Sequence, residues 1–228
     1  RGVCGTQVAL SSSIRSVVMA TRLVIQGEYS RIFCNVRPPG HHAYASKARG
    51  FCIINNVMIA AKYALVHAHP SVDRVAIVDW DFHHGDGTES IAQNDPNILY
   101  MSIHGFGYGI YPETGADDMT GLYDNVCNYP MAPGCDHDDV VRIFESSLIP
   151  RLTEFSPDLI LISCGFDAHK LDPVGLFQYE TATFGWMTRS LVAVAKKVCS
   201  GRIVSILEGG YNPVSLGESS IAHVSSLI

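Results

Sequence analysis

The feature that most constrains the fold of this chain is a series of five short, β-branched apolar runs separated mostly by longer helical stretches. Such runs are typical of strands that are buried on both faces, as in a parallel sheet covered by helices. They occupy residues 32–36, 74–79, 98–103, 158–163 and 202–207. Strands that alternate with helices predict an α/β fold with a three-layer, doubly wound and mostly parallel sheet.

Apolar stripes at helical spacing predict the connecting helices. The clearest stripe consists of Phe184, Met187, Leu191, Val194 and Val198. Helices are expected over residues 6–26, 55–67, 137–153 and 180–199, and weaker ones over 88–93 and 213–223. Because no repeat or linker interrupts the pattern, residues 1–228 are expected to form one domain.

Composition excludes several classes of function. Hydrophobic residues make up 47% of the chain, which favours a sizeable core over disorder. The formal net charge of −6 disfavours a nucleic-acid partner, because phosphate binding needs a basic face. The seven cysteines are odd in number and lack a Cys-x-x-Cys pair, which favours reduced thiols inside the cell, in cytoplasm or nucleus. No apolar run of membrane-spanning length and no signal peptide are expected, and hence no membrane partner.

Polar clusters follow the predicted strands, at the edge of the sheet where ligands usually bind. These clusters cover residues 37–42, 79–84, 102–104, 164–167 and 208–211. Five clusters at the same edge predict a functional site there.

The strongest signal for chemistry is the segment VDWDFHHGDG at residues 78–87. Asp81 and His83 are two residues apart in an extended segment, so their side chains can project to the same side. A carboxylate and an imidazole make half of a tetrahedral zinc site, and Asp167 could supply a third ligand. Three protein ligands leave one position open for water, as in catalytic zinc sites. Asp79 points the other way and, as a buried carboxylate, should orient a histidine or help to hold a structural cation.

Successive motifs of the chain resemble those of class II histone deacetylases and their bacterial relatives, in the same order, from about residue 6 to residue 223. The motifs are RPPGHHA at residues 37–43, GFCIINN at 50–56, the run at 79–87, GFDA at 165–168 with Asp172-Pro173, and LEGGYN at 207–212. The resemblance implies the arginase/deacetylase type of α/β fold. It also implies one Zn²⁺ per chain and hydrolysis of acetyl-lysine side-chain amides in proteins such as histones.

The resemblance assigns a role to each matching residue. The zinc ligands are Asp81, His83 and Asp167. The catalytic residues are His42 as general base and then acid, His41 as its electrostatic partner, Asp79 and Asp86 behind the two rings, and Tyr211 as oxyanion donor. The acyl-lysine tunnel is lined by Gly50, Phe51 and Tyr111, with Val174 at its rim. A structural K⁺ is held by Asp79, Ser102 and backbone oxygens near Asp81, His83 and Ile103.

One residue departs from the class II pattern, and two others distinguish the chain from ureohydrolases of the same fold. Asp86 stands where the class II pattern usually has asparagine, and an acid there should increase the basicity of His42. His169 stands where a two-manganese ureohydrolase of the same fold would have a carboxylate, and Gly85 replaces a bridging acid, so one metal ion is expected. His169 itself is expected to approach the rim or to face solvent. His67, His69, His104, His137 and His223 are expected to be structural or to lie at the surface, and His84 to make a supporting hydrogen bond.

Two other functions remain open alternatives. An acetylpolyamine amidohydrolase would benefit from an acid at the tunnel mouth, where this chain has Val174. A catalytically silent acyl-lysine-binding scaffold would not need the full set of ligands, histidines and Tyr211. The partners expected are an acetylated protein or peptide and corepressor or other proteins. The chain begins at Arg1, and we expect that an N-terminal part of the usual family domain is missing, to be supplied by another segment or a second chain.

Overall fold

A fully parallel sheet of six strands lies at the centre of the structure, in the order β1-β6-β5-β2-β3-β4. The computed structural model describes residues 3–68 and 70–228. The strands are β1 Arg31–Cys34, β2 Val75–Asp79, β3 Ile98–Gly105, β4 Val126–Met131, β5 Leu159–Cys164 and β6 Ile203–Leu207. All five predicted strands are present within two residues of their predicted bounds, so the predicted α/β fold is confirmed.

The sixth strand, β4, is absent from the sequence prediction. Its sequence VCNYPM contains an asparagine and a proline, which weaken the strand pattern. β4 lies at the edge of the sheet and pairs only with β3. Proline is tolerated at such an edge because one side of the strand needs no ladder hydrogen bonds.

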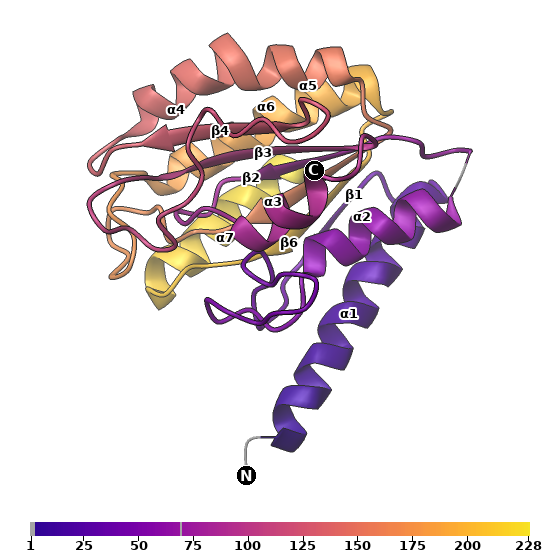
Figure 1. Cartoon of the computed structure of the whole chain (residues 1–228), viewed down its shortest axis with the longest axis horizontal. Coiled ribbons are helices and arrows are strands. Elements are labelled where there is room, and N and C mark those ends of the chain that lie inside the picture. Colours follow the sequence, from indigo (N-terminus) through magenta and orange to yellow (C-terminus); the bar gives the residue numbers. More distant parts are fainter. Residues whose placement is uncertain (1–2, 69) are drawn as a thin grey trace.

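Helices cover both faces of the sheet (Figure 1). One face carries α1 Val3–Ile25, α2 Asn56–His67 and α3 Asp86–Ala92; the other carries α4 His137–Ile143, α5 Ile149–Phe155, α6 Thr181–Val198 and α7 Pro213–Leu227. A hydrophobic core lies between the sheet and the helices on each face. Successive residues of a strand point into opposite cores: Ile77 packs with α1, α2 and α3, and Val78 packs with the helices of the other face. The predicted α6 stripe packs into the second core, where Phe184, Met187 and Leu191 are fully buried.

One predicted helix is interrupted. The stretch expected to be a helix at residues 137–153 consists of α4, a π-helical turn at Phe144–Leu148, and α5. Pro150 lies in the first turn of α5 and has no N–H for the α-helical hydrogen bond, so the ladder changes its pairing just before it.

The expectation that no apolar run reaches membrane-spanning length is wrong for α1. Residues Gly5–Ile25 of this helix have a mean hydropathy of 1.4 and are long and apolar enough to cross a membrane by length and composition. The core helix of a soluble protein passes the same test, and Val17 and Val24 of α1 do lie in the core. The N-terminal half of α1 extends away from the sheet (Figure 1).

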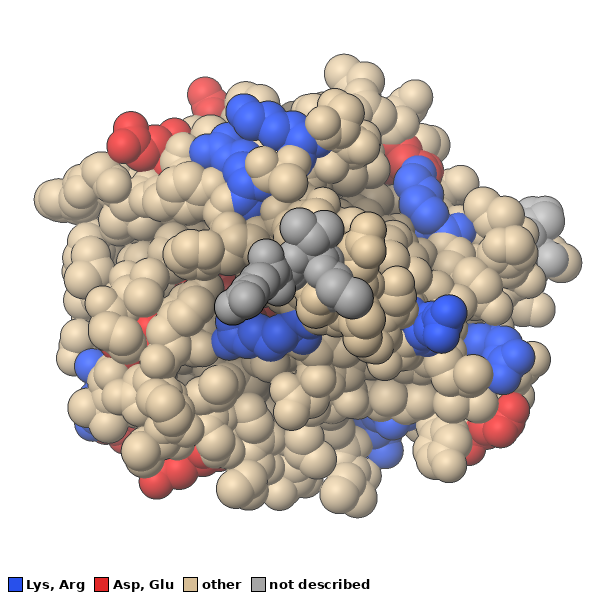
Figure 2. All heavy atoms as spheres, turned by 90° about the horizontal axis from the view of Figure 1, so that it is seen from below, with Lys and Arg blue, Asp and Glu red and all other residues tan. Residues whose placement is uncertain are grey.

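Charges on the face from which α1 projects are dispersed. Figure 2 shows lysine and arginine side chains in separate small groups, with aspartate and glutamate between and around them, on a surface of mostly uncharged residues. Among the described residues, this face has no continuous basic patch of the kind that phosphate binding needs.

The order of the strands positions the site. After β2 the chain continues outward to β3 and β4, whereas after β5 it continues in the opposite direction to β6. The connections that follow β2 and β5 therefore diverge and leave a crevice at the carboxyl edge, where ligands bind in open α/β sheets. Asp81 and Asp167 each lie two or three residues beyond these two strands.

Candidate active site

Three side chains meet in this crevice in a cluster that could hold a metal ion. The donor atoms of Asp81, His83 and Asp167 lie within 4.8 Å of one another. Nδ1 of His83 lies 3.2 Å from Oδ1 of Asp81 and 3.0 Å from Oδ2 of Asp167. The other oxygen of each aspartate accepts a backbone N–H, from Gly209 at 2.7 Å and from Phe82 at 2.9 Å, so one oxygen of each faces the ring.

The charges of this cluster fit a divalent cation. Both aspartates are buried, which is costly for ionised carboxylates without a cation. Burial and the charge of Asp81 raise the pKa of Asp167 to about 6. Burial lowers the pKa of His83, but hydrogen bonds to Asp167 and Asp81 and their charges outweigh it and raise that pKa to about 10. Two carboxylate oxygens and one imidazole nitrogen form a donor set that zinc accepts, and a divalent ion would compete with protons for these atoms.

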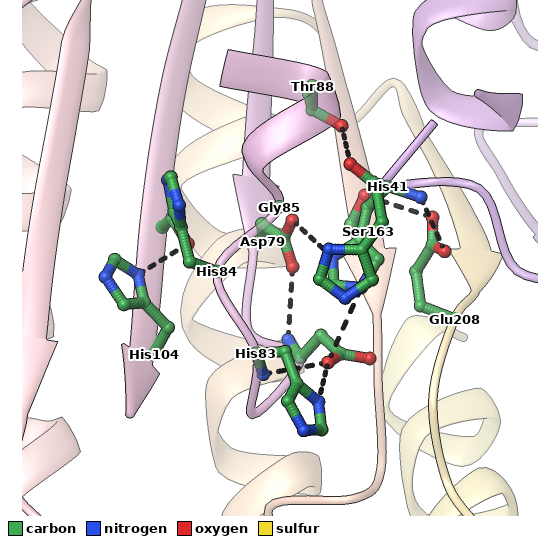
Figure 3. Close-up of polar contacts among 12 residues, drawn as sticks. His41, Asp79, His83, His84, Gly85, Thr88, His104, Ser163 and Glu208 are labelled. Atoms are coloured by element: carbon green, nitrogen blue, oxygen red, sulfur yellow. Dashed lines mark hydrogen bonds and ion pairs between the residues drawn. The ribbon is translucent and has the colours of Figure 1, made fainter. Parts of the chain in front are cut away.

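His41 is fixed on three sides (Figure 3). Its Nδ1 lies 3.1 Å from Oδ2 of Asp79, and its carbonyl accepts the backbone N–H of Thr88 at 3.0 Å. Its backbone N–H donates to Oε2 of Glu208 at 3.1 Å. The structure places Asp79 beside the His41 ring, and its role in orienting that ring stays a prediction.

His42 lies next to His41, with 4.0 Å between the ring centroids. Its Nδ1 lies 2.8 Å from Oδ1 of Asp86, the first residue of α3. Gly50 passes directly beneath the ring: it has φ +53°, and a Cβ there would come within 2.5 Å of His42. Only glycine fits this combination of backbone conformation and close approach.

The two imidazoles are in opposite electrostatic environments. Burial lowers the pKa of His41, but the charges of Asp81 and Asp79 outweigh it and raise that pKa well above its usual value. Burial and the neighbouring charge of His41 lower the pKa of His42 to about 4, against the effect of Asp86. The protonated form is therefore favoured at His41, and the neutral form, which can accept a proton, is favoured at His42.

The predicted tunnel residues line one cavity of about 370 Å³ beside this cluster. The cavity is lined by Pro39, His41, His42, Gly50, Phe51, His83, Tyr111, Val174, Gly209 and Tyr211. The ring of Tyr111 meets that of His42 edge-on at 4.9 Å, and the Phe51 ring lies 6.1 Å from the Tyr211 ring. Phe51 is 75% exposed, so it lies at the mouth.

Tyr211 is positioned by two residues that the sequence motifs did not single out for this role. Oδ2 of Asp172 accepts the backbone N–H of Tyr211 at 2.6 Å. The guanidinium of Arg37 lies 5.5 Å from the centroid of the Tyr211 ring and donates to the carbonyl of Gly210 at 2.7 Å. Burial and the charges of Asp81 and Asp167 raise the pKa of Tyr211, so its hydroxyl keeps its proton.

The residues predicted to hold a structural cation lie on adjacent strands. Asp79 and Ser102 are paired across β2 and β3, and both are fully buried. Asp79 already accepts hydrogen bonds from the Tyr100 hydroxyl at 3.1 Å and the Asp81 N–H at 3.2 Å, and Oγ of Ser102 lies 2.9 Å from Nδ1 of His104. Ile103 follows Ser102 in β3 and is buried. The K⁺ site stays a prediction.

Glu208 is a central residue that sequence reasoning missed. It is fully buried directly after β6, and its Oε2 accepts the backbone N–H groups of Gly40 and His41 at 2.6 and 3.1 Å. Burial raises its pKa to about 7, although the charge of His41 acts against this. An acid that immediately follows a predicted buried strand is the signal that could have identified it.

The remaining histidines are structural or peripheral, with one correction. His169 neither faces solvent nor reaches the cavity, because its ring is buried parallel to that of Phe184 and its Nδ1 accepts the N–H of Leu171. His84 makes the expected supporting contacts, to Thr114 at 2.8 Å and Glu89 at 3.0 Å. His104 and His223 are buried, His67 is exposed, and His69 lies outside the described residues.

A parallel α/β sheet with two buried carboxylates and an imidazole at its switch point defines a class of protein with a candidate metal site, and comparisons with known proteins identify the family. The family model of the histone deacetylase domain matches residues 4–227. Histone deacetylase HDA1 of Candida albicans is 39% identical over 223 residues, which cover 95% of this chain and 26% of that protein. Histone deacetylase 14, chloroplastic, of Arabidopsis thaliana is 40% identical over 210 residues, which cover 90% and 48%.

A solved structure gives the same result at the level of the fold. The crystal structure of the HDA15 HD domain matches with a TM-score of 0.87 and 37% identity, over 92% of this chain and 59% of that one. The chain thus spans less than two thirds of the length of each of these relatives. The chain belongs to the histone deacetylase family, a zinc-dependent family, and has its arginase/deacetylase fold.

Proposed function

We propose that this protein hydrolyses acetyl-lysine side-chain amides in proteins such as histones, with one zinc ion per chain. The observation that carries the proposal is the convergence of three groups of residues at one cavity. The cavity is lined by His83 of the metal-ligand set, by the two imidazoles in unlike environments and by Tyr211. Amide hydrolysis needs an activated water, a base that becomes an acid, and a donor for the oxyanion, and these residues supply each of them.

The chain's own residues divide the chemistry between them. Asp81, His83 and Asp167 would hold the zinc ion, which when bound supplies Lewis acidity and makes hydroxide available near pH 7. The lowered pKa of His42 favours its neutral form, so His42 would accept the proton of the attacking water and return it to the leaving amine. His41 keeps its proton and stabilises negative charge, and Tyr211 donates its hydroxyl proton to the developing oxyanion.

The walls of the cavity favour a neutral acyl-lysine as substrate. A methylene stem packs well against the aromatic faces of Phe51 and Tyr111, whereas the ammonium of an unmodified lysine would lose its hydration there. An acetylpolyamine carries a further ammonium that needs an acid at the mouth. Val174 at the rim is apolar, and the nearby Asp172 is buried and accepts the N–H groups of Tyr211, Asn212 and Val174. The peptidyl substrate is therefore the better match.

Further parts of the proposal rest on the family resemblance. A structural K⁺ beside Asp79 and Ser102 and an intracellular location are its implications, and corepressor or other protein partners are compatible with it. A silent acyl-lysine-binding scaffold is disfavoured by the retention of all three metal ligands, both histidines and Tyr211.

The test compares two substrates on the zinc-loaded protein. We expect acetate release from an acetyl-lysine peptide to exceed that from acetylspermidine, and Tyr211→Phe to reduce kcat by roughly 10²–10³ through loss of the oxyanion donor. The zinc content of this variant, measured by atomic absorption, should match that of the parent. Full activity of Tyr211→Phe would remove Tyr211 from the mechanism, and preferential cleavage of acetylspermidine would replace the proposed substrate class.

A further inference from the structure

The carboxylate behind His42 has a second set of partners. Oδ1 of Asp86 faces His42, while its Oδ2 accepts the hydroxyl of Tyr44 at 3.0 Å and lies 3.0 Å from Nη1 of Arg49. The Asp86 side chain is only 2% exposed, so its charge depends on these neighbours. Arg49 thus provides a positive counter-charge for the acid that replaces the usual asparagine of the class II pattern.

Arg49 also holds the wall of the cavity. Its Nε donates to the hydroxyl of Tyr111 at 2.8 Å, and its guanidinium lies 5.1 Å from the centroid of the Tyr111 ring. Tyr111 in turn contacts His42 edge-on. His42, Asp86, Arg49 and Tyr111 therefore form a closed ring of contacts, in which Arg49 links the carboxylate behind the base to the aromatic wall beside it.

The backbone of Arg49 is fixed independently of these contacts. Reciprocal backbone hydrogen bonds join Arg49 and Cys52 at 3.1 and 2.9 Å, and Gly50 passes under His42 between them. The guanidinium side chain is 28% exposed, so it lies at the edge of the site and not in the core. Its planar fork can bind a carboxylate and a hydroxyl at the same time, which the single ammonium of lysine cannot do in the same geometry.

We propose that Arg49 is a positioning residue, which holds the His42–Asp86 pair and the Tyr111 wall in a fixed relation around the acyl-lysine stem. The inference rests on the proposed deacetylase function for its kinetic consequences only. Arg49 does not itself line the cavity and has no contact with the proposed metal ligands, so it acts through Asp86 and through the lining residue Tyr111.

The two contacts predict different kinetic effects. Arg49→Met removes both and is expected to lower kcat roughly tenfold and to raise KM for an acetyl-lysine peptide several-fold. Arg49→Lys keeps the counter-charge for Asp86 but not the fork, so kcat should recover while KM stays raised. Arg142→Met is the matched control, because Arg142 is 69% exposed, pairs with Asp139 on α4, and should leave both constants unchanged. If Arg49→Met merely reduced the amount of folded protein, kcat would fall and KM would stay unchanged. Arg49→Lys would then not restore kcat selectively.

A double variant tests the charge balance. In an Asp86→Asn background the guanidinium has no carboxylate to balance, so Arg49→Met should cost less than about threefold in kcat. The proposal is overturned if Arg49→Met costs the same factor in both backgrounds, or if it leaves kcat and KM of the parent within twofold.

A second readout does not depend on turnover. Amide hydrogen exchange over residues 106–113, the segment that carries Tyr111, should be faster in Arg49→Met than in the parent and in Arg142→Met. Unchanged exchange would overturn the proposal that Arg49 holds the Tyr111 wall, even if the enzyme were active. If the parent released no acetate, the proposed function would fail, and exchange would still decide whether Arg49 holds the wall.

Discussion

At the scale of single residues, the site depends on carboxylates that accept hydrogen bonds from backbone N–H groups, in addition to those that contact the histidine rings. Glu208 accepts two N–H groups of the loop that carries the paired histidines, and Asp172 does the same for the loop that carries Tyr211. A carboxylate with several acceptor positions can satisfy the donors of a tight loop that has no secondary structure of its own. These acids fix the reacting side chains through the backbone.

Replacement of Glu208 by alanine should therefore destabilise the protein. The change leaves the Gly40 and His41 N–H groups buried without an acceptor, which should cost roughly 2–4 kcal/mol of unfolding free energy. Glu208→Gln keeps an acceptor oxygen and should cost less. Urea denaturation measures both, with Glu154→Ala as an exposed-glutamate control expected within about 0.5 kcal/mol of the parent. Equal stability of Glu208→Ala and the control would contradict this role.

At the scale of elements, α7 is attached to the sheet through a buried histidine. His223 of α7 lies between β6 and α6, with Nε2 2.8 Å from Oγ of Ser205 and Nδ1 2.6 Å from Oγ1 of Thr188. The ring also packs edge-on against Phe33 and Trp80. Burial lowers its pKa to about 3, so α7 docks with a neutral imidazole.

This docking should make the stability of the protein depend on pH. The pKa of His223 is about 3 in the folded chain and about 6.5 in the unfolded chain, so between these values the unfolded chain binds more protons. The stabilisation is complete above about pH 6.5 and is lost as the pH falls towards 3. At pH 4.5 the loss should be roughly 2–3 kcal/mol.

His223→Gln is the variant that measures this effect. The slope of unfolding free energy against pH between 4 and 6.5, from urea denaturation, should be shallower than in the parent. His67→Gln, which removes an exposed histidine at the end of α2, should keep the slope of the parent. The same slope in His223→Gln would show that other groups cause the acid sensitivity.

At the scale of the whole molecule, the proposed metal ligands join parts of the chain that are far apart in sequence. Asp81 and His83 follow β2, Asp167 follows β5, and the Gly209 N–H that supports Asp81 follows β6. No such set of neighbours exists in an unfolded chain, so an ion that binds it stabilises the folded state.

Zinc should therefore raise the melting temperature of the protein. At a free zinc concentration 100 times Kd, the added unfolding free energy should be about 2.7 kcal/mol. Scanning calorimetry with and without chelator measures it. Asp167→Asn should abolish most of the difference, whereas Asp118→Asn, an exposed loop acid, should retain it. A zinc-independent melting temperature in the parent would contradict the metal site.

The sequence by itself determined the α/β class, five of the six strands and the residues that converge at their carboxyl ends. This was possible because burial on both faces leaves a continuous apolar signal, and because parallel strands bring their carboxyl ends to one edge. The spacing of Asp81 and His83 added the metal hypothesis, and the family motifs added the paired histidines and Tyr211.

Only the tertiary structure decided which polar residues support these groups. β4 carries too weak a local signal, and the roles of Glu208, Asp172 and Arg49 depend on neighbours up to 168 residues away in the sequence. The order of the strands brings such residues together, and periodicity within one segment carries no information about that order. Local patterns reflect burial, whereas the partners of a buried charge are set by how the whole chain packs.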